Sequence, residues 1–207
     1  MFKSLALPFL VSLAFISPVQ AGVTLIASGA LAGSSDLSGL SGTLENGVAA
    51  NILGGMGSGL AWAGGNTFLA LPDRGPNASS YSGGSAVDNT TSYIDRFQTV
   101  SLNLTQSNNA GVYSYALNAA LNQTTLLYSP GALNYGSTAG LPSAQPVQNM
   151  AERNYFTGRS DNFGAGNSLA VNNARFDPEG IRVANDGKSV FISDEYGPYV
   201  RQFDRSS

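Results

Sequence analysis

The sequence predicts an all-β fold, and three observations lead to that prediction. Only 11% of the 207 residues are charged, well below the quarter that is usual for a soluble domain. Glycine is abundant, with 25 residues, and glycine and asparagine tolerate the positive φ angles of tight turns. Apolar runs of strand length are separated by such turns, most clearly by Asn-Asp-Gly at residues 185–187. This pattern is typical of many short strands and fits long helices poorly.

Residues 1–21 read as a secretory signal peptide. Lys3 supplies a short positive start, residues 5–16 are largely apolar, and residues 19–21 form a small-residue cleavage site. The apolar run is too short to span a bilayer, which takes about 20 residues. We therefore expect an exported protein, periplasmic or extracellular, with no stable membrane anchor after cleavage.

The mature chain, residues 22–207, is expected to alternate between strands and turns. A first strand is expected at residues 23–27. A glycine cluster at 54–59 then leads into a hairpin with strands at 60–62 and 67–71. This cluster lacks the Gly-Lys-Ser/Thr ending of a phosphate-binding loop, so we interpret it as a strand-entry turn. Further strands are expected at residues 94–104, 113–117, 124–128, 168–171, 180–183, 189–193 and 199–203.

The absence of cysteine and histidine from the sequence restricts its chemistry. It excludes a cysteine nucleophile, a Ser-His-Asp triad and a His/Cys zinc site within these residues. A bound metal would need oxygen ligands, which favours calcium or magnesium. The net charge of −3 and the lack of a Lys/Arg run argue against nucleic-acid binding.

Two hairpins resemble each other. Residues 59–73 align with residues 180–194 at an offset of 121 residues, and each segment ends in an acid, Asp73 or Asp194. Repeated strand–turn–strand units that end in a polar loop favour β-propeller blades, which usually span about 40–50 residues. The wider offset leaves open an elaborated first blade, an insertion or an intervening blade. Chance similarity of two hairpins is the remaining alternative.

These residues also carry a resemblance to a known family. Asp-Pro-Glu-Gly-Ile at residues 177–181, with Phe-Ile-Ser-Asp-Glu-Tyr-Gly-Pro at 191–198, resembles the signature of the phytase-like, or "esterase-like activity of phytase", family. Residues 58–62 and 71–76 resemble its first repeat, and residues 95–97 resemble an element between the two. The resemblance implies an exported protein with a β-propeller-like fold that hydrolyses esters, including phosphate esters.

The family domain is longer than this chain. The resemblance therefore implies that residues 22–207 are the N-terminal part of the domain, an incomplete propeller of two or three blades. A closed propeller needs at least four blades. We expect a truncated product, a gene fragment or part of a longer protein.

Acidic residues at strand ends are the candidate metal ligands. Asp177 and Glu179 lie two residues apart, so in an extended stretch they point to the same side, and a cation would relieve their repulsion. The alternative is a turn in which Asp177 caps backbone N–H groups. In a propeller, Asp73 and Asp194 would reach the same channel mouth. With the resemblance, this predicts calcium ligands among Asp73, Asp177, Glu179 and Asp194.

The catalytic residues are not identified by the sequence, and the candidates are Glu179, Asp194 and Glu195. The last two are neighbours and point to opposite faces of a regular strand. One can therefore face the channel while the other pairs with Arg182 or Arg201.

Arg74 and Arg182 are the candidate substrate-binding residues. The planar guanidinium of Arg74 suits a phosphate group, and a local pair with Asp73 is the alternative. The sequence thus predicts an ester hydrolase, calcium-assisted, that acts on a small phosphate or carboxylic ester. The alternatives are a non-catalytic β-propeller that binds a ligand and an inactive fragment.

Overall fold

The computed structural model describes five stretches of the chain, residues 22–77, 90–136, 148–159, 170–197 and 199–205. Within them every regular element is a β-strand and none is a helix, which confirms the all-β prediction. No membrane-crossing helix is present in that part of the chain. The expected signal peptide, residues 1–21, lies outside the described residues.

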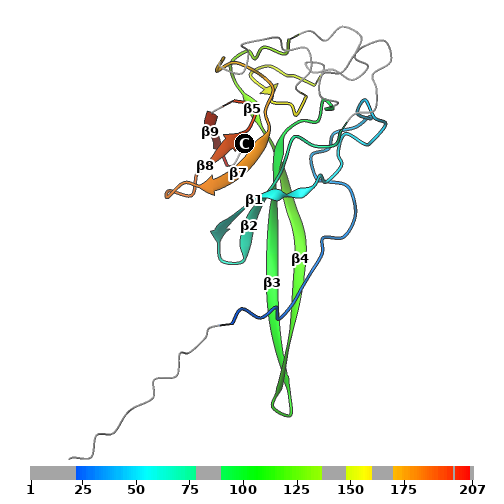
Figure 1. The fold of residues 1–207 in the computed structure, drawn as a ribbon, viewed down its shortest axis with the longest axis vertical. Helices are drawn as coiled ribbons and strands as arrows, with labels where there is room; N and C mark the ends of the chain where they lie inside the picture. Colours follow the sequence, from blue (N-terminus) through cyan, green and yellow to red (C-terminus); the bar gives the residue numbers. More distant parts are fainter. Residues whose placement is uncertain (1–21, 78–89, 137–147, 160–169, 198, 206–207) are drawn as a thin grey trace, which may run out of the picture.

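The largest sheet is a four-stranded antiparallel meander in the order β1-β2-β3-β4 (Figure 1). Its strands are β1 (Met56–Gly64), β2 (Thr67–Pro72), β3 (Arg96–Asn109) and β4 (Val112–Leu126). The β1–β2 turn needs positive φ at both of its glycines, 110° at Gly64 and 54° at Gly65. Glycine adopts both angles without strain, and the hairpin predicted here is confirmed.

Two smaller sheets follow along the chain. The first pairs β5 (Tyr128–Ser129) with β6 (Asn154–Tyr155). The second is a three-stranded antiparallel meander of β7 (Pro178–Val183), β8 (Ser189–Asp194) and β9 (Tyr199–Asp204). The β7–β8 hairpin and the strand after it agree with the sequence prediction.

The core lies between the β1–β4 sheet and the β7–β9 sheet. Its buried side chains come from both sheets and from the segments that join them: Ala61, Leu69, Leu71, Phe97, Leu127, Phe156, Phe176, Ile181, Val190 and Ile192. The ring of Phe156 packs against Phe176 and Phe203, with centroids 5.4 and 5.6 Å apart. The two sheets therefore share one hydrophobic core.

The first strands of the two meanders, β1 and β7, lie side by side although they belong to different sheets. A Cβ atom on Gly59 would lie 3.1 Å from the backbone nitrogen of Ile181. The absence of a side chain at Gly59 thus permits this close approach.

Between the two meanders, the described residues add only the small β5–β6 sheet. This arrangement favours an elaborated first unit over a complete intervening blade, and the sheets do not close into a ring.

The predicted alignment of the two hairpins agrees with the structure for the second strand of each, β2 and β8. It is shifted by one residue for the first strands, β1 and β7. In β2 and β8 the aligned residues Leu69 and Val190 are both buried. In β1 and β7, however, Leu60 is 55% exposed while its aligned residue Ile181 is 1% exposed. The reason is register: each first strand has an irregularity near its beginning, but of different length. By register the counterpart of Ile181 is Gly59, because Ile181 pairs with Ile192 and Gly59 pairs with the aligned Leu71.

Four predicted strands differ from the structure. Residues 23–27 form no strand, and Val23 and Leu25 are exposed, because no neighbouring strand offers a ladder. Residues 113–117 and 124–128 do not form two separate strands: β4 is continuous because β3 pairs along almost its whole length. Ala170 and Val171 are not in a strand, and the rest of that predicted strand lies outside the described residues.

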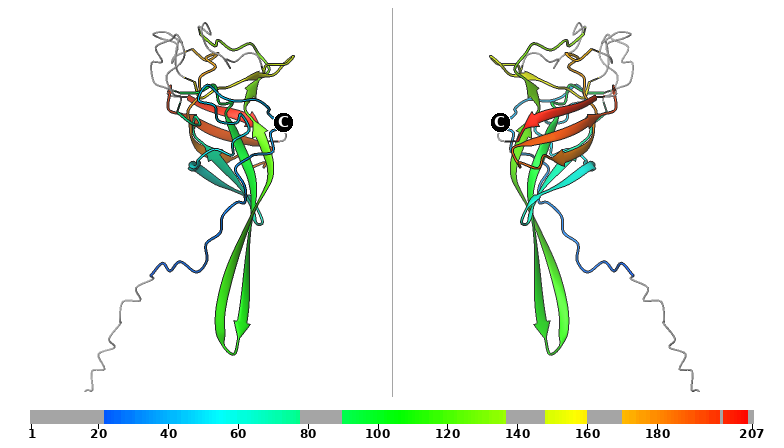
Figure 2. Two further views of the ribbon diagram at one scale, coloured as in Figure 1. Left: turned by 90° about the vertical axis from the view of Figure 1, so that its right-hand side faces the viewer. Right: turned by 90° about the vertical axis from the view of Figure 1, so that its left-hand side faces the viewer.

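The β3–β4 hairpin extends far beyond the rest of its sheet as an arm (Figure 2). The last residue of β3 that pairs with β2 is Ser101. Beyond it, one face of the arm carries apolar and aromatic side chains such as Leu104 and Tyr113, which are 52% and 58% exposed. No charged residue occurs from residue 97 to residue 151.

Candidate functional site

Three carboxylates meet where β7 begins and β8 ends. Asp177 directly precedes β7, Glu179 lies within it, and Glu195 directly follows β8. One carboxylate oxygen of each lies within 4.8 Å of one from each of the others. The pairing of Pro178 with Asp194 brings these strand ends together. We refer to Asp177, Glu179 and Glu195 as the acidic trio.

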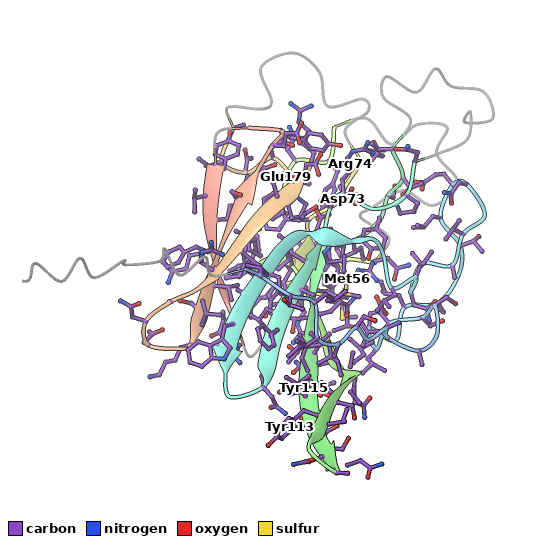
Figure 3. The ribbon with its side chains drawn as sticks, turned by 60° about the horizontal axis from the view of Figure 1, so that its bottom comes forward. Met56, Asp73, Arg74, Tyr113, Tyr115 and Glu179 are labelled. Atoms are coloured by element: carbon purple, nitrogen blue, oxygen red, sulfur yellow. The ribbon has the colours of Figure 1, made fainter. Side chains whose placement is uncertain are left out.

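The loop after β2 reaches the same place. Figure 3 shows Asp73 and Arg74 beside Glu179, at the end of the molecule opposite to the arm. The backbone N–H of Arg74 donates to Oδ1 of Asp177 at 3.2 Å, and its Nε lies 3.5 Å from Oδ2. Arg74 therefore pairs with Asp177 across the two hairpins. The local Asp73–Arg74 pair considered in the sequence does not explain its position.

Asp73 and Asp177 each accept a backbone hydrogen bond. Oδ1 of Asp73 accepts the N–H of Gly75 at 2.9 Å, which closes its own turn. Asp73 therefore caps its own turn. Asp177 instead caps a loop from another part of the chain and also belongs to the acidic trio.

Two glycines hold the Arg74 loop against the body of the protein. Gly75 has a φ of 82°, and a Cβ atom there would lie 2.4 Å from the ring of Tyr93. A Cβ atom on Gly158 would lie 1.8 Å from the carbonyl oxygen of Arg74. The hydroxyl of Tyr196 donates to the carbonyl of Gly158 at 3.0 Å. The position of Arg74 thus depends on close backbone packing from both sides.

Asp194 and Glu195 separate as strand alternation predicts. Asp194 is 8% exposed, and its Oδ1 accepts the N–H groups of Asp177 and Tyr196, each at 3.0 Å. Its Oδ2 is buried without a hydrogen-bond partner among the described residues. Glu195 is exposed and joins the trio. Asp194 therefore fixes the backbone at the start of β7 through its hydrogen bond with the N–H of Asp177.

Burial raises the pKa of both aspartates here to about 6. For Asp177, the hydrogen bond and charge of Arg74 oppose the rise. For Asp194, its two backbone hydrogen bonds and the charge of Arg201 oppose it. Burial and the neighbouring Glu195 also raise the pKa of Glu179. The site thus holds carboxyl groups that lose their protons near neutral pH, and a cation would favour their ionised forms.

Asp95 lies beside this site, although the sequence suggested it only as part of the family resemblance at residues 95–97 and not as a site residue. It lies between Ile94 and β3, is 0% exposed, and neither carboxylate oxygen has a hydrogen-bond partner among the described residues. Burial, then the charges of Asp194 and Asp177, raise its pKa well above the usual range. An acid between Ile94 and Phe97, within a partly alternating strand, was the available signal.

Arg182 does not join the site. It pairs with Phe191 in the middle of the β7–β8 hairpin, and its guanidinium donates to the carbonyl of Ile181 at 3.0 Å. Arg201, the other suggested partner, lies over the ring of Phe156 with its guanidinium carbon 4.8 Å from the centroid. Of the two candidate substrate-binding arginines, the structure places Arg74 beside the acids.

A groove of about 530 Å³ runs beside the Arg74 loop. It is bordered by the loop itself and by the segment before β1, including Gly54 and Gly55. Arg74 therefore lies between this groove and the acidic trio. A small anionic molecule in the groove would meet the guanidinium of Arg74.

Comparison with known proteins gives the family. Residues 51–207 match the family described as "Phytase-like: Esterase-like activity of phytase". The chain is also 31% identical to an "Uncharacterized secreted protein" of Arthroderma benhamiae (strain ATCC MYA-4681 / CBS 112371), over 71% of this chain and 26% of that protein. It thus spans about a quarter of that relative's length. No solved structure matches. Because the family match covers most of the sequence, this chain belongs to the phytase-like family.

Proposed function

We propose that this chain is part of an exported hydrolase of phosphate or carboxylic esters, assisted by a divalent cation. The observation that carries the proposal is the acidic trio, whose oxygens lie within 4.8 Å of one another. Carboxylate oxygens suit hard cations, and calcium accepts such ligands in flexible geometries. Export is supported by the leader-like residues 1–21 and by the relative, which is described as a secreted protein.

The surroundings of the trio support a cation in this position. The backbone N–H of Arg74 fixes the orientation of the Asp177 carboxylate, as partners of metal ligands usually do. Glu179 and Glu195 are exposed, so water and substrate can reach them. A bound cation would neutralise substrate charge and activate a water molecule.

Arg74 is the proposed substrate-binding residue. Its side chain is 28% exposed and borders the groove. Its Nη1 also donates to Asn77 at 2.9 Å, which holds the guanidinium plane in position. A planar guanidinium binds phosphate or carboxylate oxygens through paired hydrogen bonds. We assign the substrate acid group to this contact.

Whichever of Glu179 and Glu195 does not bind the cation directly is the proposed general base. Both are exposed beside the groove-lining Arg74, and burial together with Glu195 raises the pKa of Glu179. A base is most effective when its pKa approaches the working pH. Asp194 is less suited to this role because it is buried and its Oδ1 accepts two backbone N–H groups.

The fold supports a propeller as the architecture of the complete domain. Each meander runs outward from its first strand, and the first strands β1 and β7 lie together. This is the arrangement of neighbouring blades around an axis. On this proposal, the acidic trio lies at a channel mouth, where loops from successive blades converge.

Ester turnover by the full chain tests the proposed function. We expect hydrolysis of p-nitrophenyl phosphate or p-nitrophenyl acetate with calcium, and loss of turnover with a chelator. Glu179→Gln should reduce the rate at least about a hundredfold, the low end for loss of acid–base catalysis. The matched control is Asp186→Asn, an exposed acid in the β7–β8 turn.

A second candidate is a propeller that binds a ligand without catalysis. The observation that favours it is the uncharged arm with its exposed Tyr113 and Tyr115, since tyrosine is enriched at binding surfaces. The turnover assay separates the two. A folded chain that binds calcium but hydrolyses neither ester supports the binding function.

A further inference from the structure

Beneath the acidic trio, the interior contains carboxylate oxygens that lack hydrogen-bond partners among the described residues. These are both oxygens of Asp95 and the Oδ2 of Asp194. Asp95 is 0% exposed and Asp194 is 8% exposed. Buried polar groups are nearly always hydrogen-bonded, because an unpaired buried charge is strongly unfavourable. These two carboxyl groups are therefore either protonated or compensated by something besides the described side chains.

Neither Arg74 nor Arg96 bonds to these two aspartates, although Nη2 of Arg96 has no hydrogen-bond partner among the described residues. Arg96, next to Asp95 in sequence, pairs with Asp36 and donates to the carbonyl of Ile94. Arg74 pairs with Asp177 and donates to Asn77. Neither Asp95 nor Asp194 forms a salt bridge with a described residue.

Arg201 is a partial exception. Its charge acts on Asp194, but its guanidinium lies over the rings of Phe156 and Tyr199 and donates to the carbonyl of Val171. It does not bond to either aspartate, although its Nε and Nη2 have no hydrogen-bond partner among the described residues. The carboxylate oxygens of Asp95 and the Oδ2 of Asp194 thus remain without a direct partner among these arginines.

The backbone fixes Asp95 in this interior position. Its N–H donates to the carbonyl of Phe156 at 3.2 Å, and its carbonyl accepts the N–H of Leu127 at 2.8 Å. The strongest charge interactions on its carboxylate come from Asp194 and then Asp177. Asp95 therefore lies on the interior side of the site, whereas Glu179 and Glu195 lie at its surface.

We propose that Asp95 and Asp194 hold a second cation in an inner subsite, either directly or through its coordinated water. The ligands are carboxylate oxygens, so the cation is a hard one, and calcium is the choice that follows from the proposed function on which this inference rests. Asp177 separates the two subsites: it belongs to the trio, and its N–H donates to Asp194. The inner ion would stabilise the fold and position the outer one.

Calorimetric titration of the full chain with calcium at about pH 7.5, above the pKa of about 6 of Asp177 and Asp194, tests this inference. We expect two binding events in the unsubstituted chain and in the Asp186→Asn control. Asp95→Asn should lose the inner event and keep the outer one, whereas Glu179→Gln should lose the outer event and keep the inner one. A single event that Glu179→Gln removes and Asp95→Asn leaves unchanged would overturn the inner subsite while leaving the proposed function intact. Absence of binding would overturn both.

A second measurement covers the case in which Asp95→Asn does not fold. Crystals of the unsubstituted chain, soaked with terbium as a calcium substitute, should show anomalous density between Asp95 and Asp194. Directly bound calcium ligands lie at about 2.3–2.6 Å, and a water-mediated contact would be about 2 Å longer. Density at the trio but none near Asp95 would contradict the inner subsite.

Discussion

The backbone N–H of Arg74 donates a hydrogen bond to the Asp177 carboxylate across 103 positions of sequence. This bond joins the loop that follows β2 to the residue that precedes β7. Because Arg74 also forms an ion pair with Asp177, the acid-bearing ends of the two hairpins make one site. Changes on either hairpin should therefore affect the acidic trio.

Gly158 tests this dependence from outside the trio. Gly158→Ala should displace the Arg74 loop, because the new Cβ would lie 1.8 Å from the Arg74 carbonyl oxygen. We expect an unfolding free energy lower by about 1–3 kcal/mol, the usual range for overpacking, and weaker calcium binding. Urea denaturation and calorimetry measure the two effects. Gly57→Ala is the control, since its Cβ would meet no atom within 4 Å; equal behaviour of the two variants would refute the argument.

The pKa values of Asp177 and Asp194 predict how stability depends on pH. Both rise in the folded state from 3.8 to about 6, so between these values the folded chain binds more protons than the unfolded chain. Without calcium, these groups should make the unfolding free energy fall as pH rises from about 4 through about 6. Thermal melts in chelator measure this slope, which Asp177→Asn should reduce.

Calcium should oppose this fall in the unfolding free energy at higher pH. Calcium binds the ionised carboxylates, so the rise in melting temperature that it causes should be larger at about pH 7.5 than at about pH 5. Equal shifts at both pH values would show that Asp177 and Asp194 do not govern binding.

The buried pair of Arg96 and Asp36 should be essential to stability. Both side chains are 0% exposed, and the guanidinium carbon of Arg96 lies 3.9 Å from the centroid of the Tyr93 ring. Asp36→Ala would leave the Arg96 charge buried without its partner, and we expect a loss of about 3–5 kcal/mol. Urea denaturation measures it, and a loss below about 1 kcal/mol, as for a surface pair, would contradict the prediction.

The arm should be dispensable for folding. Replacing residues 106–115 by Asn-Gly would join Thr105 to its partner Ala116 through a favoured two-residue turn. The removed side chains are exposed, so the melting temperature should change by less than about 4 °C, which corresponds to about 1 kcal/mol. A larger fall would show that the arm packs against the body.

The sequence identified the parts of the fold that local patterns determine. The tight turn at Gly64 and Gly65 and the two-residue spacing of Asp177 and Glu179 are properties of neighbouring residues, and the structure places both as local geometry requires. The continuity of β4 was missed because it depends on the length of its partner β3. A strand at residues 23–27 was expected from composition alone, but a strand also needs a partner.

In the candidate site, too, local patterns identified some residues, whereas those that depend on distant contacts were missed. The sequence grouped Asp73, Asp177 and Glu179 through repeat and alternation. It did not find Asp95, because the burial of that carboxylate results from contacts with Leu127 and Phe156 that are distant in sequence. Arg182 was grouped with the site through its position beside the signature, but strand register places it in the middle of the hairpin.

The most direct test of the central claim is the melting temperature of the full chain in chelator and in about 10 mM calcium, which exceeds the dissociation constants usual for extracellular calcium sites. We predict that calcium raises the melting temperature of the unsubstituted chain and of Asp186→Asn by about 5 °C or more. The double variant Glu179→Gln/Glu195→Gln should show a clearly smaller rise. An unsubstituted chain whose melting temperature is the same in both solutions would contradict a cation held by the acidic trio.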